Sequence, residues 1–121
     1  MRVALLSAVL LLQGALALAQ SGEIQPKPML ESDEFQRMKT QYRDCVLDKG
    51  RELMSVTSFE TAMQYAPLAC RRGLLQIKQF MLGSAFKVEV VDGLLASVAE
   101  GVEIDLVRAL LEQKLAESPE P

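Results

Sequence analysis

The chain holds only two cysteines, Cys45 and Cys70, and 24 residues lie between them. Their midpoint falls next to Thr57, which stands three residues before Glu60, the spacing of a capping box at a helix start. Two helices joined by a tight turn pack antiparallel, so residues equidistant from the turn become neighbours. We therefore predict a disulfide between Cys45 and Cys70 that links an antiparallel helical hairpin.

The alternative for these cysteines is a redox-active pair. Redox catalysts usually hold their cysteines in a Cys-x-x-Cys turn at a helix N-terminus, a spacing that this chain lacks. Both Cys45 and Cys70 lie on apolar stripes, so we expect both side chains to be buried. A structural disulfide closing a loop of this length stabilises a small domain by about 3 to 4 kcal/mol in the chain-entropy model.

Helical periodicity defines the two arms of the hairpin. The first predicted helix spans about 32–54, with Ser32 as its N-cap, and the second begins at Thr57 and ends before Gly83. The proline within residues 65–67 predicts a kink or a break there. The apolar stripe of the first helix comprises Phe35, Met38, Tyr42, Cys45, Val46 and Leu53, and that of the second comprises Phe59, Met63, Ala66, Cys70, Leu74, Ile77 and Met81.

The last third of the chain admits two interpretations. Residues 86–91 alternate apolar and polar like a strand, but a stripe of Phe86, Val90, Leu94 and Val98 also fits a helix. Because a lone strand would have no partner, we predict a helix over 85–100 that Gly101 ends. A last helix over 102–117 carries its own apolar side, made of Val102, Leu106, Ala109 and Leu110. The predicted fold is all-α, a small three- to four-helix bundle forming one domain over residues 31–117.

The N-terminus has the pattern of a signal peptide over residues 1–19. Arg2 precedes an apolar stretch, and Ala17-Leu18-Ala19 provides the small-x-small pattern before a cleavage site. We expect cleavage after Ala19 and a periplasmic or secreted protein. The apolar stretch is shorter than the roughly 20 residues that span a bilayer, so we predict no transmembrane segment in the mature chain. Residues 20–30, with two prolines, are predicted as an extended lead-in, and 118–121 as a disordered tail.

Composition excludes several classes of function. The chain has no histidine, which removes Ser-His and Cys-His nucleophiles and most catalytic zinc sites. Glycine-rich nucleotide loops and calcium loops are absent from the sequence. Thirteen basic and 16 acidic side chains give a net charge of −3, which argues against nucleic acid as a partner. We predict that the protein is not an enzyme and has neither a cofactor nor a metal site.

Asp44, Asp48 and Glu52 form an acidic row at four-residue spacing on the first helix. The row is either a docking edge or weak cation site, or a solvated face relieved by neighbouring arginines, and we favour the solvated face. Arg51 lies three residues from Asp48. Arg71 is placed to pair with Asp44 across the hairpin, a contact worth at most about 1 kcal/mol if exposed.

The segments YRDCVLDKG and AMQYAPLACRRGLLQI resemble a group of small exported two-cysteine helical proteins of proteobacteria, most of them uncharacterised. The resemblance covers residues 42–77 and rests on Cys45 and on the spacing of Ala62, Ala66, Ala69 and Cys70. It implies a periplasmic or secreted bacterial protein. It carries over no catalytic residue.

These observations leave three hypotheses for function. The leading one is a non-catalytic interaction module, an adaptor, inhibitor or immunity-type protein, that binds another exported protein through a helix face. The second is a carrier of a small molecule or lipid, with a cavity opened by the kink at Pro67. The third, a secreted helical cytokine, is disfavoured because every linker is short.

Overall fold

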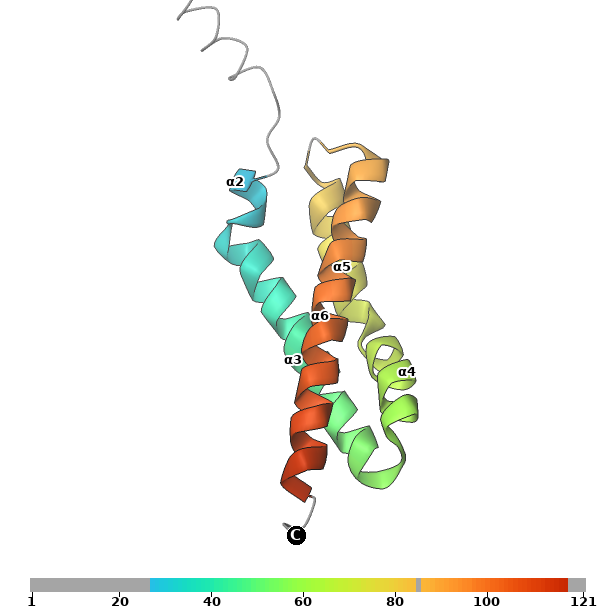
Figure 1. Cartoon of the computed structure of the whole chain (residues 1–121). Helices are drawn as coiled ribbons and strands as arrows, with labels where there is room; N and C mark the ends of the chain where they lie inside the picture. The colour runs from blue at the N-terminus through green and yellow to red at the C-terminus, as the bar shows by residue number, and fades with distance from the viewer. Residues whose placement is uncertain (1–26, 85, 118–121) are drawn as a thin grey trace, which may run out of the picture.

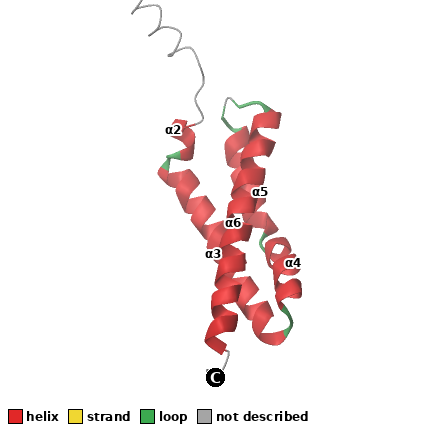
Figure 2. Cartoon of the chain, in the orientation of Figure 1, coloured by secondary structure: helices red, strands yellow, loops and turns green. Residues whose placement is uncertain are grey.

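The computed structural model describes residues 27–84 and 86–117, which are helical apart from short connections. The predicted signal peptide (1–19), the first part of the lead-in (20–26) and the predicted tail (118–121) lie outside the described residues. The helices are α2 (Lys27–Leu30), α3 (Asp33–Val56), α4 (Phe59–Ala69), α5 (Arg71–Leu82) and α6 (Val88–Glu117). No strand occurs in the described part of the chain (Figure 2). The predicted all-α fold is confirmed, and from Val88 onward the ambiguous segment is helical.

The helices form a small bundle around one core (Figure 1). Helix α3 crosses the molecule diagonally behind α6 in this view, and α4 returns beside it, which makes the predicted antiparallel hairpin. Helix α5 continues in the direction of α4. Helix α6 then runs back along the molecule and packs against α3, α4 and α5.

The lead-in is not extended throughout, which corrects the prediction for residues 20–30. Residues 27–30 form the single turn α2, whose second residue, Pro28, is tolerated because the first helical turn needs no backbone donor. The Gln36 side-chain amide donates a hydrogen bond to the Leu30 carbonyl at 2.6 Å. Met29 and Leu30 pack against the core. These contacts to α3 hold the turn in place.

Helix α3 begins as predicted. The backbone N–H of Phe35 donates to the Ser32 hydroxyl oxygen at 3.2 Å, and Asp33 and Glu34 occupy the first turn, where carboxylates complement the helix dipole. The helix continues to Val56, slightly beyond the predicted end.

The hairpin turn lies where the cysteine midpoint predicts, but the prediction of Thr57 as the cap of the second helix is wrong. Because α3 extends to Val56, Thr57 belongs to its C-terminal end, and its hydroxyl donates to the Leu53 carbonyl at 2.5 Å. Ser58 takes the N-cap position of α4 instead. Its hydroxyl oxygen accepts the backbone N–H of Thr61 at 3.1 Å.

The second arm breaks into two helices, as predicted, but at Cys70 and not within residues 65–67. Pro67 lacks a backbone N–H, yet α4 continues past it to Ala69. The helix ends where Cys70 adopts φ −104° and ψ 13° and shares its N–H between the carbonyls of Ala66 and Pro67, at 3.3 Å each. Helix α5 begins at the next residue.

Helix α6 is continuous through Gly101, which corrects the prediction of two helices. A glycine weakens a helix interior by only about 1 kcal/mol, and one buried stripe on both sides of Gly101 outweighs that penalty. The buried residues of α6 are Val91, Leu95, Val98, Val102, Leu106, Ala109 and Leu110.

The stripe predicted for residues 86–98 is buried only in part. Val98 lies in the core and Phe86 and Leu94 are half-buried against it, but Val90 is 43% exposed, and the neighbouring Val91 and Leu95 are buried instead. Four residues advance a helix by about 400°, so consecutive four-residue steps drift by about 40° each. A straight buried stripe must mix steps of three and four.

Candidate functional site

Helix α6 is apolar on two opposite sides in its C-terminal half. One side is buried, as predicted for Val102, Leu106, Ala109 and Leu110. On the opposite side Ile104, Leu111 and Leu115 are 55%, 48% and 75% exposed, and Val107 is half-buried. We call these four residues, Ile104, Val107, Leu111 and Leu115, the outer stripe.

The outer stripe forms the floor of a shallow hollow of about 420 Å³ at the surface. Arg108 and Glu112, both exposed, complete its lining. In the described part of the chain neither side chain makes an ion pair or hydrogen bond. The hollow therefore combines an apolar floor with one cationic and one anionic side chain.

The inner side of α6 holds the outer stripe in position. Leu106 and Leu110 are fully buried, and Gly50 of α3 lies against both. At the surface Arg43 Nε of α3 donates to Asp105 Oδ2 at 2.9 Å, and Lys78 Nζ of α5 lies 3.4 Å from Asp92 Oδ1. The outer stripe is thus carried by a helix that is anchored to both arms of the hairpin.

The apolar side predicted for residues 102–117 is the inner stripe, made of Val102, Leu106, Ala109 and Leu110, and the outer stripe was not predicted. The signal for the outer stripe is nevertheless present in the sequence, since residues 104, 107, 111 and 115 are apolar at steps of three and four. In this structure one of the two stripes is buried in the core and the other is exposed in the main.

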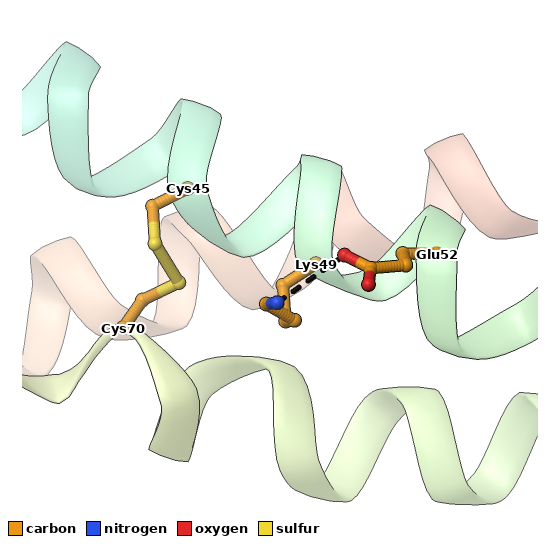
Figure 3. The surroundings of a disulfide bond; sticks show 4 residues. All are labelled: Cys45, Lys49, Glu52 and Cys70. Atoms are coloured by element: carbon orange, nitrogen blue, oxygen red, sulfur yellow. Dashed lines mark hydrogen bonds and ion pairs between the residues drawn. A yellow bond between two sulfur atoms is a disulfide. The ribbon is translucent and has the colours of Figure 1, made fainter.

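The predicted disulfide is confirmed. The sulfur atoms of Cys45 and Cys70 are 2.12 Å apart and their Cα atoms 5.9 Å apart (Figure 3). The bond joins the middle of α3 to the junction between α4 and α5. The expectation that both cysteines are buried is half right, because Cys70 is 3% exposed whereas Cys45 is an exposed residue.

The three carboxylates of the acidic row each have a basic neighbour within α3. Asp44 pairs with Arg43 and Asp48 with Arg51, each at 3.6 Å. Glu52 pairs with Lys49 at 3.2 Å (Figure 3). The prediction that Asp44 pairs with Arg71 across the hairpin is wrong. Asp44 pairs instead with Arg43, its neighbour in the same helix, which does not have to reach from α3 to α5. All of these carboxylates are exposed, as a solvated face requires.

Tyr42 of α3 is a titratable residue whose pKa is shifted by its surroundings in the fold. Its side chain is buried against Gly73 of α5, whose position allows the two helices to approach. Burial raises the pKa of the Tyr42 hydroxyl above its usual value, and the carboxylate of Glu103 raises this pKa further. The group stays protonated at neutral pH and has no role as a base there.

Two further observations concern ligands and membranes. Within residues 27–84 and 86–117, no three side chains of the types that bind metals gather into a group, and none of the helices is sufficiently long and apolar to cross a membrane.

A second hollow, of about 250 Å³, lies between α2, α3 and α6 and is lined by residues such as Leu30, Phe35 and Leu94. Pro67, where the carrier hypothesis expects a cavity, lines neither hollow.

No protein-family model, curated protein or solved structure matches the chain.

Proposed function

We propose that the protein is an exported, non-catalytic interaction module that binds another protein chain through the outer stripe of α6. The observation that carries the proposal is the exposure of Ile104, Leu111 and Leu115 on a helix whose other side is anchored in the core. Three large aliphatic side chains at helical spacing favour an apolar helix as the bound element. The absence of histidine from the sequence supports a non-catalytic role.

Export is supported by the disulfide and by the N-terminal sequence. Intramolecular disulfides persist in oxidising compartments, and residues 1–19 have the composition of a signal peptide. Intact-mass measurement of the protein from the exported fraction is expected to show a chain that begins at Gln20 and holds no free thiol. A full-length intracellular chain would contradict export.

The binding role is tested by capture of a partner with matched variants. Tagged mature protein is incubated with its native exported fraction under non-reducing conditions, and the retained proteins are identified by mass spectrometry. We expect one protein at near-equal stoichiometry with the wild-type chain and none with Leu111→Glu, because a carboxylate in the apolar contact would lose its hydration.

Leu75→Glu is the matched control, since Leu75 is an equally exposed leucine on α5. The captured protein is then purified and its binding measured against all three chains. Equal binding of the wild-type and Leu111→Glu chains would contradict a role for the outer stripe. Circular dichroism of both variants verifies that each retains its helices.

A further inference from the structure

The outer stripe is nearly symmetric about its own centre. Ile104 and Leu115 lie at its ends and Val107 and Leu111 inside, so its midpoint falls between residues 109 and 110. If two such helices run antiparallel about a two-fold axis at that midpoint, Ile104 of each lies level with Leu115 of the other. Apolar side chains at steps of three and four interdigitate in this arrangement.

The charged side chains of Arg108 and Glu112 are also related favourably by this two-fold axis. Arg108 and Glu112 are four residues apart on one edge of the stripe, and a two-fold axis perpendicular to the helices places this edge on the same side in both copies. In the antiparallel register Arg108 of each copy lies about 1.5 Å along the axis from the level of Glu112 of the other. Two opposite-charge pairs therefore form, one on each side of the axis.

We propose that the outer stripe of α6 binds the outer stripe of a second copy of this chain, with the two α6 helices antiparallel. This inference rests on the proposed function, since it names the partner of the same face. The self-complementary charges favour a second copy over an unrelated helix, which would have to supply its own matching acid and base. The contact involves only about three turns of one helix from each copy, so we expect the dimer to be in equilibrium with the monomer.

The test is sedimentation equilibrium of the disulfide-bonded mature protein over a wide concentration range. Arg108→Glu places two carboxylates at each pair, and Glu112→Arg places two cations there. Each substitution alone is expected to weaken the dimer about tenfold, because the dimer contains two such pairs. The double variant Arg108→Glu/Glu112→Arg restores opposite charges and is expected to dimerise like the wild type.

Mixing the two single variants provides a second measurement. A heterodimer of the Arg108→Glu chain and the Glu112→Arg chain has opposite charges at both pairs, so the mixture is expected to associate more strongly than either variant alone. Leu111→Glu is expected to abolish the dimer, and Leu75→Glu on α5 to leave it unchanged. Thermal unfolding of each variant separates loss of contact from loss of fold.

A wild-type chain that remains monomeric throughout would overturn the inference, as would a dimer that survives Leu111→Glu. A double variant and a mixture no stronger than the single variants would overturn the antiparallel register. Failure of the inference is distinct from failure of the proposed function. A monomer that still captures another protein through Leu111 leaves the proposed function intact, whereas a monomer with no such partner removes both.

Discussion

Gly50 determines how closely α3 and α6 can approach. A Cβ atom at this position would overlap Leu106 Cδ1 and lie 3.6 Å from Leu110 Cδ2. Leu106 and Leu110 are fully buried, so neither side chain can move aside without disturbing the core. The absence of a side chain at Gly50 is therefore a packing requirement, and it explains a glycine in the middle of a long helix.

Gly50→Ala is expected to lower the free energy of unfolding by up to about 2 kcal/mol, since overpacking costs about 1 to 3 kcal/mol and the helix preference of alanine offsets about 1 kcal/mol. Gly101→Ala is the control, because nothing lies within 4 Å of its added Cβ. That variant is expected to be more stable than the wild type by about 0.5 to 1 kcal/mol. Chemical denaturation measures both, and a stabilised Gly50→Ala variant would contradict the close approach.

Tyr42 makes the fold sensitive to alkaline pH. Its pKa is raised by burial and by Glu103, so the folded chain holds the phenolic proton more tightly than the unfolded chain does. The stability that this provides is fully present below the usual tyrosine pKa of about 10 and is lost as the pH rises through the higher pKa of the folded state.

In the Tyr65→Phe variant Tyr42 is the sole tyrosine, so absorbance at 295 nm reports its ionisation alone. We expect the midpoint to lie above the usual value. We also expect Tyr42→Phe to flatten the fall in melting temperature above about pH 10. A midpoint at or below the value in the denatured chain would show that Tyr42 is not buried as described.

At the scale of the helices, the junction between α3 and α4 is short, and its two hydroxyl groups, of Thr57 and Ser58, form hydrogen bonds to different helices. Ser58 caps α4 through the N–H of Thr61, whereas the Thr57 hydroxyl donates to a carbonyl of α3. Ser58→Ala is expected to lower the free energy of unfolding by about 0.5 to 2 kcal/mol, the usual loss for an N-cap. Thr57→Ala is expected to have a smaller effect, because a helix-end carbonyl can turn to water.

Urea denaturation of the two variants side by side measures this difference. A larger loss for Thr57→Ala than for Ser58→Ala would restore Thr57 as the cap of the second helix. Both residues are exposed, so neither substitution leaves a cavity that would obscure the comparison.

At the scale of the whole molecule, the disulfide constrains the two arms of the hairpin. Its loop has a sequence separation of 25, and the chain-entropy model assigns such a loop about 3 to 4 kcal/mol of stabilisation. The Cys45→Ala/Cys70→Ala variant is expected to lose stability by about this amount while its circular dichroism stays helical at low temperature. Thermal unfolding of the variant and of the oxidised wild type measures the loss.

Reduction of the disulfide provides a second measurement. The reduced wild type is expected to have about the same melting temperature as the double alanine variant, because both lack the cross-link. Reduction without a change in melting temperature would show that the disulfide does not constrain the hairpin.

Local features of the sequence determined the class of fold, the disulfide and some of the helix boundaries. The N-cap Ser32, the turn near residues 57–58 and the end before Gly83 are recognisable because capping and turn formation depend on a few neighbouring side chains. The position of the turn could be predicted from the midpoint between the two cysteines, because residues equidistant from the turn of a helical hairpin lie opposite each other. The outer stripe was also present in the sequence, at 104, 107, 111 and 115, but spacing alone does not say which of two apolar stripes is buried.

Only the tertiary structure decided between alternatives of similar local free energy. Gly101 weakens a helix whether or not the helix continues, and the core stripe from Val91 to Leu110 selects one helix over two. The break at Cys70, the exposure of Cys45 and the close approach at Gly50 likewise depend on residues far away in the chain. The physical reason is that packing sums many weak contacts between distant residues, and that sum exceeds the preference of about 1 kcal/mol that a single residue expresses.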